Sequence, residues 1–171
     1  LNVTMPYKKA VLPLCDELGA RARLSGSVNT LVRRADGTLF GTNTDYDGLS
    51  FALDNAGIAI RGKKCLVLGN GATSKTVCTV LADKGAREIV VFGRHDAVPY
   101  TEIPLHHDAE VIVNATPVGM YPNNGARLID LDGFAHLEAC FDVIYNPHRS
   151  QFLLDAERRG VGRLVHARDA A

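Results

Sequence analysis

The sequence predicts an α/β fold in which a doubly wound parallel sheet is joined to part of a smaller α/β unit. Short strand-like segments alternate with segments of helical periodicity along most of the chain. Several strand-like segments are apolar throughout, as expected of parallel strands that are buried on both faces. Glycines and polar residues follow these segments, at the edge where the carboxyl ends of parallel strands gather and ligands bind.

The composition narrows the class of protein. The chain has 171 residues, which suffices for one or two domains. Its formal net charge is zero, which argues against nucleic acid or a membrane surface as a partner. No apolar segment approaches the ~18 residues of a membrane span, and no signal-peptide pattern opens the sequence. The four cysteines form no Cys-x-x-Cys pair, and the histidines lack metal-ligand spacing. We therefore expect a cytoplasmic protein with free thiols and no metal.

The first part of the chain predicts a helix and a hairpin. Residues 8–18 have apolar positions at helical spacing, and Gly19 can end that helix. Residues 28–32 and 38–42 predict two strands, joined by a turn that ends in Asp-Gly. A further helix follows, with Leu49 and Leu53 on one face, and we place a domain boundary close to Asp47.

A glycine loop lies at the centre of the second part. The apolar run 65–68 predicts a strand, and residues 75–84 predict a helix that ends at Gly85. Between them, Gly69 permits a tight turn and Gly71 lets the backbone approach a phosphate, while the start of a helix favours an anion. An ordinary strand–helix turn is the alternative. The residues predicted to bind the pyrophosphate of a dinucleotide are Gly69, Asn70, Gly71, Ala72 and Thr73.

The remaining elements continue the alternation of a Rossmann-type sheet. Strands are predicted at residues 89–92, 111–113 and 140–145, and a helix at residues 151–159. The segment 93–108 is short and contains two prolines, so we expect a trimmed connection in place of a full crossover helix.

The residues after these strands predict how a cofactor would bind. Arg94 follows the second strand of the sheet, where an enzyme that prefers NAD usually has an acidic residue. A guanidinium pairs with a 2′-phosphate, so Arg94 indicates NADP, the alternative being a solvated surface arginine. Thr116, Met120 and Val143 lie near the ends of later strands, where a loop would pass beside the nicotinamide.

Lys8 and Asp45 are the candidate catalytic pair. Reduction of a ketone by a nicotinamide requires a proton donor for the developing alkoxide, and a lysine beside a carboxylate can supply that proton. Asp45 would orient the ammonium and accept a hydrogen bond from a substrate hydroxyl. Asn29 and Thr4 would supply neutral hydrogen bonds to a polyol substrate.

Six ordered motifs in the chain resemble the shikimate dehydrogenase family. Members of this family reduce 3-dehydroshikimate to shikimate with NADPH, on the route to chorismate and the aromatic amino acids. The resemblance implies the same oxidoreductase function, NADP as cofactor, a small-molecule substrate, and a monomer or homodimer. The motifs are residues 2–8, 26–31, 43–45, 69–73, 114–120 and 142–147.

The resemblance also implies residue roles. Lys8 matches the acid/base lysine and Asp45 its partner, Thr4 and Asn29 match substrate-binding positions, and Tyr145 matches a tyrosine that lines the substrate site. The sites predicted above for the pyrophosphate, the 2′-phosphate and the nicotinamide also match, although Gly93 and His95 replace the usual neighbours of Arg94. The implied units are a partial substrate-binding and catalytic domain (1–46), an NADP-binding domain (47–147) and a C-terminal helical segment that returns toward the first (148–171).

The sequence departs from the family at both ends. Family members begin with a further segment that carries a serine pair for the substrate carboxylate, and a substrate-binding glutamine near their C-terminus has no counterpart here. The chain is therefore either part of a longer protein or a shortened relative. Residues 1–46 are few for a stable core of their own, which favours the first reading.

Three other functions remain open from the sequence. One is an NADP-binding module without catalysis. Another is a quinate/shikimate dehydrogenase that uses NAD, against which Arg94 argues. The third is a lysine-using dehydrogenase of the methylenetetrahydrofolate type, against which residues 43–45 and 114–120 argue.

Overall fold

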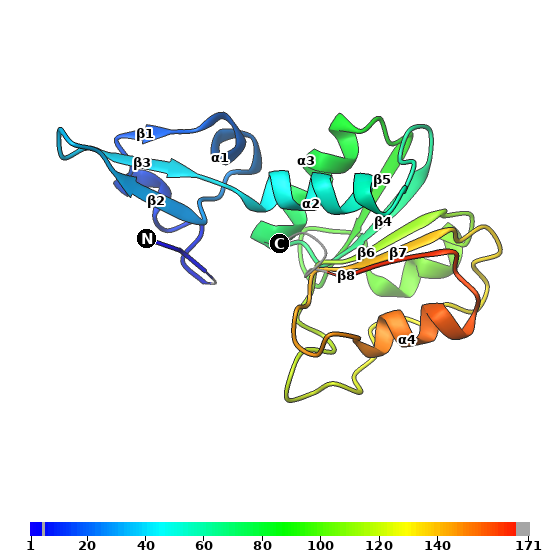
Figure 1. The fold of residues 1–171 in the computed structure, drawn as a ribbon. Helices are drawn as coiled ribbons and strands as arrows, with labels where there is room; N and C mark the ends of the chain where they lie inside the picture. The colour runs from blue at the N-terminus through cyan, green and yellow to red at the C-terminus, as the bar shows by residue number, and fades with distance from the viewer. Residues whose placement is uncertain (5, 167–171) are drawn as a thin grey trace.

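Two sheets organise the computed structural model, which describes residues 1–4 and 6–166. A three-stranded sheet has the order β1-β3-β2, and a five-stranded sheet has the order β5-β4-β6-β7-β8. Helix α2 leads from the small sheet to the large one (Figure 1). The large sheet is parallel throughout, so the predicted α/β class with a parallel, Rossmann-type sheet is confirmed.

The small unit is built around the predicted hairpin. Strands β2 and β3 pair antiparallel, with Thr30 opposite Thr42, and β1 pairs parallel with β3. The turn at residues 34–37 has Gly37 at a φ of +89°, a left-handed conformation that glycine adopts without strain. The elements of this unit are η1 (Leu12–Leu14), β1 (Glu17–Leu18), α1 (Ala20–Ser25), β2 (Thr30–Arg33) and β3 (Leu39–Thr42).

The prediction of a helix at residues 8–18 is wrong, because the structure has no α-helix there. Turns occupy residues 6–11, and they lead into the single 3₁₀ turn η1 and then into β1. Pro13 lies within η1, and a proline inside an α-helix lacks the N–H that the helix needs and clashes with the preceding turn. Gly19 does not end a helix but stands at the start of α1, which ends at Gly26 with a φ of +60°.

The large unit alternates strands and helices as predicted. Its β4, α3, β5 and β6 lie within a few residues of the predicted positions, and the connection between β5 and β6 holds a 3₁₀ helix in place of a full crossover helix. The elements are α2 (Asp45–Asn55), β4 (Lys64–Leu68), α3 (Ala72–Asp83), β5 (Glu88–Phe92), η2 (Tyr100–His106), β6 (Val111–Asn114), β7 (Ala139–Asp142), α4 (Gln151–Arg158) and β8 (Arg163–His166).

Two hydrophobic cores cover the two faces of the large sheet. Val67 and Val113 point into the core formed with α2 and α3, whereas Leu66 and Ile112 point into the core formed with η2 and α4. Neighbouring residues of one strand thus serve opposite cores, because successive side chains of a strand alternate between faces. Both faces are covered, which explains why these strands are apolar throughout.

The C-terminal part differs from the prediction in two ways. Strand β7 ends at Asp142, three residues before the predicted end at Tyr145. The segment expected to be a helix returning toward the small unit forms α4 and then β8, which pairs parallel with β7 as an edge strand of the large sheet. Leu164 and Val165 in β8 pack on opposite cores, and this burial favours a strand. Residues 167–171 of that prediction lie outside the described residues, as does Met5 of the first motif.

Among the described residues, the helices are too short or too polar for any of them to cross a bilayer.

Gly41 gives a test of packing in the small sheet. It is buried in β3, and an added Cβ would lie 2.6 Å from Cys15 Sγ and 2.9 Å from Val28 Cγ2. We expect Gly41→Ala to lower the free energy of unfolding by about 1–3 kcal/mol, the usual cost of overpacking a core. Urea denaturation measures this change. Gly125→Ala, whose Cβ would meet nothing within 4 Å, should change stability by less than about 0.5 kcal/mol, and an equal effect of both variants would contradict the packing argument.

Candidate functional site

An ion pair between Lys8 and Asp45 joins the N-terminal turns to the start of α2. Lys8 Nζ lies 2.6 Å from Asp45 Oδ2, and their side chains are 14% and 36% exposed. Asp45 is the first residue of α2, directly after the segment that follows β3. The structure therefore brings together two residues that lie 37 positions apart in the sequence.

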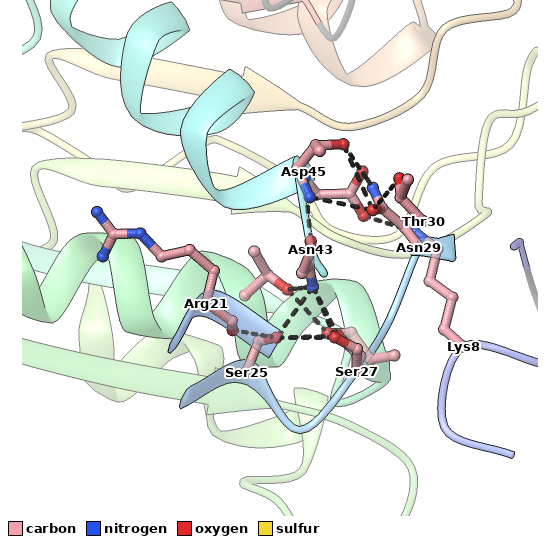
Figure 2. Close-up of polar contacts among 11 residues, drawn as sticks. Lys8, Arg21, Ser25, Ser27, Asn29, Thr30, Asn43 and Asp45 are labelled. Carbon is pink, nitrogen blue, oxygen red and sulfur yellow. Dashed lines mark hydrogen bonds and ion pairs between the residues drawn. The ribbon is translucent and has the colours of Figure 1, made fainter. Parts of the chain in front are cut away.

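Asn29 holds the second oxygen of the Asp45 carboxylate (Figure 2). Asn29 Nδ2 donates to Asp45 Oδ1 at 2.7 Å, while Asn29 Oδ1 accepts from the backbone N–H of Thr44 at 3.0 Å and from the hydroxyl of Thr30 at 2.9 Å. Each carboxylate oxygen thus has its own donor, so the orientation of Asp45 is defined on both sides. Sequence reasoning gave Thr30 no role, although it directly follows Asn29 and its hydroxyl donates to the Asn29 side chain.

A cavity of about 450 Å³ opens beside this ion pair. It lies where the small unit meets the carboxyl end of the large sheet, because its walls include residues from both. The small unit contributes the Lys8–Asp45 pair to the lining, and the large unit contributes an apolar wall that includes Val77, Phe141 and Val143. Predicted site residues that line it are Thr4, Lys8, Asp45, Thr73, Thr116, Met120, Val143 and Tyr145.

The glycine loop stands at the edge of this cavity, between β4 and α3. Gly69 has a φ of +104°, and a Cβ there would lie 2.9 Å from Thr116 Cγ2 and 3.0 Å from the carbonyl oxygen of Ala115. Gly71 precedes the first residue of α3, no side chain caps this helix start, and a Cβ on Gly71 would meet nothing within 4 Å. The free N–H groups of a 12-residue helix therefore face open space, which suits a phosphate group.

Arg94 does not line the cavity but lies beside the glycine loop. It lies two residues after the end of β5 and is exposed. The Asn70 side chain donates to the backbone carbonyl of His95 and lies against Gly93, where a Cβ would approach Asn70 Cγ to 2.8 Å. The loop carrying Arg94 is thus tied to the glycine loop.

Asp142 supports the apolar wall from within the protein. It is fully buried at the end of β7 and accepts hydrogen bonds from the Ser150 hydroxyl, from Asn114 Nδ2 at 3.2 Å and from the N–H of Ile144 at 3.0 Å. Burial raises the pKa of the Asp142 carboxyl, and this effect outweighs that of the three hydrogen-bond donors, which lower the pKa. Asn114 in turn accepts from the N–H and hydroxyl of Thr116. Sequence reasoning assigned Asp142 no separate role, although a lone acid that ends an apolar strand was a usable signal.

The described residues contain no group of three or more histidine, cysteine or acidic side chains placed to hold a metal ion. All four cysteines are free, and burial raises the pKa of the Cys65 thiol to about 12. The cavity itself is lined by a lysine, a carboxylate and several hydroxyl groups close to the start of α3.

Comparison with known proteins identifies similar chains. Residues 1–31 match the family described as "Shikimate dehydrogenase substrate binding domain". A shikimate dehydrogenase (NADP(+)) of Methanopyrus kandleri is 38% identical, over 97% of this chain and 67% of the relative. One of Geobacillus sp. is 34% identical over 97% of this chain and 69% of the relative. One of Caldicellulosiruptor bescii is 33% identical over 94% of this chain, which spans only 62% of that relative.

Solved structures show the same similarity. A chorismate mutase/shikimate 5-dehydrogenase fusion protein of Clostridium acetobutylicum matches with a TM-score of 0.90 and 35% identity, over 99% of this chain and 64% of that one. Shikimate 5-dehydrogenase of Thermus thermophilus in complex with NADP(H) and shikimate matches with a TM-score of 0.86 and 31% identity, over 99% and 67%. Quinate dehydrogenase of Corynebacterium glutamicum in complex with NAD matches with a TM-score of 0.86 and 28% identity, over 99% and 67%.

The raised pKa of Asp142 predicts a pH-dependent contribution to stability. Below the ordinary aspartate pKa of about 3.9 the group is protonated in both states. As the pH rises through the raised pKa of the folded state, ionisation favours the unfolded chain, so the contribution of Asp142 to stability falls. The free energy of unfolding of Asp142→Asn relative to wild type should therefore increase as the pH rises from the ordinary aspartate pKa to the raised pKa of the folded state. Urea denaturation at a series of pH values tests this, and a difference that is constant or decreases with pH would contradict it.

Proposed function

The chain belongs to the shikimate dehydrogenase family, and we propose that it carries the site at which NADPH reduces 3-dehydroshikimate to shikimate. The observation that carries this proposal is the Lys8–Asp45 pair, which faces a cavity bordered by the glycine loop of a parallel sheet. The chain spans 62% of the Caldicellulosiruptor bescii relative and 60% of a shikimate dehydrogenase (NADP(+)) of Clostridium beijerinckii, so the activity of the whole protein is proposed from this site.

The proposed chemistry assigns the proton to Lys8. When bound, NADPH supplies the hydride that adds to the C3 carbonyl carbon. The oxygen of that carbonyl gains negative charge as the hydride adds, and Lys8 Nζ transfers a proton to it, leaving a neutral amine. Asp45 lies 2.6 Å from Lys8 Nζ, so it orients the ammonium before the transfer and is placed to accept a hydrogen bond from a neighbouring substrate hydroxyl.

Neutral side chains are proposed to hold the substrate's hydroxyl groups. Thr4 and Tyr145 line the cavity, and Tyr145 is 64% exposed at its edge. Asn29 does not line the cavity, and it makes its hydrogen bonds to Asp45, Thr44 and Thr30. We therefore propose that Asn29 acts partly by fixing Asp45.

The glycine loop fits the pyrophosphate of NADP. Gly71 leaves open space in front of the uncapped N-terminus of α3. Thr116, Met120 and Val143 line the cavity and would contact the nicotinamide, while Arg94 would pair with the 2′-phosphate. The proposed binding residues of the loop remain Gly69, Asn70, Gly71, Ala72 and Thr73.

Two other functions compete with this proposal. Use of NAD with quinate or shikimate is supported by two similar solved structures, quinate dehydrogenase in complex with NAD and shikimate 5-dehydrogenase of Listeria monocytogenes in complex with shikimate and NAD. Exposed Arg94 beside the glycine loop favours NADP. A module that binds NADP without catalysis would retain the loop but would not need the Lys8–Asp45 pair.

We also propose the division of labour between the two units. The small unit, residues 1–46, would bind substrate, and the large unit from residue 47 onward would bind NADP, with β8 included because it belongs to the large sheet. The free cysteines support a reducing, cytoplasmic location. A monomer or homodimer remains the proposed assembly.

Removal of Lys8 tests the proposed reaction. We expect Lys8→Ala to lower kcat for NADP-linked shikimate oxidation by about 10²–10⁴-fold, since it removes the acid/base group, with KM changed only a few-fold. Lys9→Ala, at the exposed neighbouring position, serves as the control and should keep wild-type activity. Wild-type protein that binds NADPH without turnover would instead support the non-catalytic module.

Arg94 tests the choice of cofactor. Arg94→Ala should raise KM for NADP about 10–100-fold, the usual effect of losing a charge-assisted hydrogen bond, and change KM for NAD only slightly. Steady-state kinetics with both cofactors measure this, and Arg33→Ala in the exposed end of β2 is a control for loss of a surface charge. A wild-type preference for NAD, or equal loss with both cofactors, would refute the assignment.

A further inference from the structure

A buried polar cluster lies behind the Lys8–Asp45 pair and joins the two units. Its centre is Asn43, whose side chain is 1% exposed and lies in the segment between β3 and α2. Asn43 Oδ1 accepts from the backbone N–H of Asp45 at 3.0 Å. Asn43 Nδ2 lies 2.9 Å from Ser25 Oγ, 2.8 Å from Ser27 Oγ and 3.3 Å from Thr76 Oγ1. Figure 2 shows Asn43 between the two serines and Asp45.

These contacts use both functional groups of the amide. A side-chain amide has one acceptor oxygen and two donor hydrogens, and here the oxygen serves Asp45 while the nitrogen faces three hydroxyl groups. Ser25, Ser27 and Thr76 are all 1% exposed, so water cannot replace the bonds without cost. The orientation of the Asn43 side chain is therefore set by four residues: Asp45 close by in the chain, Ser25 and Ser27 at and just after the end of α1, and Thr76 in α3.

Thr76 connects this cluster to the cofactor helix. It belongs to α3, the helix that begins at Ala72 directly after the glycine loop, whereas Asn43, Ser25 and Ser27 belong to the small unit. Thr76 also lines the cavity. Asn43 thus links the start of α2, which carries Asp45, to the first turns of the helix whose N-terminus would hold the pyrophosphate.

A second contact between the same elements is less able to define geometry. Arg21 of α1 stacks over the Tyr46 ring at 3.7 Å and pairs with Asp47 at 3.6 Å and Asp83 at 3.8 Å. Arg21 and both carboxylates are 40% exposed or more, and exposed ion pairs contribute little and are screened by salt. The Tyr46 hydroxyl also donates to Asp83 Oδ2 at 2.6 Å, and α2 and α3 share one hydrophobic core. The buried contacts of Asn43 add directional hydrogen bonds, shielded from water, at the end of α2 that carries Asp45.

We propose that Asn43 is a positioning residue that sets the placement of Asp45, and through it Lys8, relative to the cofactor-binding helix α3. This inference rests on the proposed dehydrogenase function for its kinetic consequence. Its geometric part concerns the protein alone. Hydride transfer needs donor and acceptor atoms in register, so a small displacement of α3 against α2 reduces the rate more than it reduces binding.

Variants at Thr76 test the link between the units. Thr76→Val replaces the hydroxyl by a methyl group of similar size and should lower kcat about tenfold, with KM for NADP and shikimate within about twofold. Thr76→Ser retains the hydroxyl and should recover at least half of the wild-type kcat. Thr79→Val is the matched control, because Thr79 lies on the same helix and its hydroxyl donates to the carbonyl of Lys75 within that helix. Wild-type kcat in Thr76→Val, or equal loss in Thr76→Ser, would overturn the proposed link.

Labelling of Lys8 tests the geometric part without turnover. Acetic anhydride labels Lys8 and its exposed neighbour Lys9, and peptide mass spectrometry gives the ratio of the two rates. We expect this ratio to rise at least about threefold in Asn43→Ala and about twofold in Thr76→Val, because Asp45 no longer holds the Lys8 ammonium as firmly. Thr79→Val should leave the ratio unchanged. Thr76→Val retains both serine contacts, so it decides the question even if Asn43→Ala does not fold.

The two experiments separate the possible failures. Wild-type protein without NADP-linked turnover would count against the proposed function, while the labelling ratio would still decide whether Asn43 positions Lys8. An unchanged ratio in both Asn43→Ala and Thr76→Val would overturn the proposal whatever the turnover.

Discussion

The Lys8–Asp45 ion pair is the interaction on which the proposed site depends. A lysine can deliver its proton to a substrate only if the carboxylate beside it is held still, and here Asn29 fixes one carboxylate oxygen while Asn43 fixes the backbone of the same residue. The pair is only partly buried, which weakens the attraction between the charges. The hydrogen bonds between Asp45 and the uncharged side chains of Asn29 and Asn43 therefore contribute much of its fixed geometry.

The parallel sheet imposes the other constraint, since it brings the remaining site residues to one edge. Gly69 ends β4, Thr116 follows β6 and Val143 follows β7, and all three strands run in the same direction. Asp142 reinforces this edge, because its buried carboxylate holds the segments after β6 and β7 together through hydrogen bonds. The apolar wall of the cavity is therefore a consequence of topology, and the polar wall is contributed by the small unit.

Local patterns account for what the sequence predicted well. Fully apolar runs such as residues 65–68 predict buried strands, and the glycine at 69 has a steric reason that the structure displays, whereas a Cβ on Gly71 would meet no atom of the protein. The prediction of a helix at residues 8–18 fails because the apolar spacing fits a helix whereas Pro13, in the middle of the segment, interrupts one. Strand β8 and the Asn43 cluster were missed because both depend on partners distant in sequence, 33 positions away for Thr76, which no local pattern encodes.

A crystal structure of this chain with NADP⁺ and shikimate tests the central claim most directly. The account predicts that Lys8 Nζ lies within hydrogen-bond distance of the C3 hydroxyl, that the C4 atom of the nicotinamide faces C3, and that the pyrophosphate sits at Gly71. The proposed role of the Lys8–Asp45 pair would be contradicted if the C3 hydroxyl of bound shikimate lay away from Lys8 and another side chain were placed to take its proton.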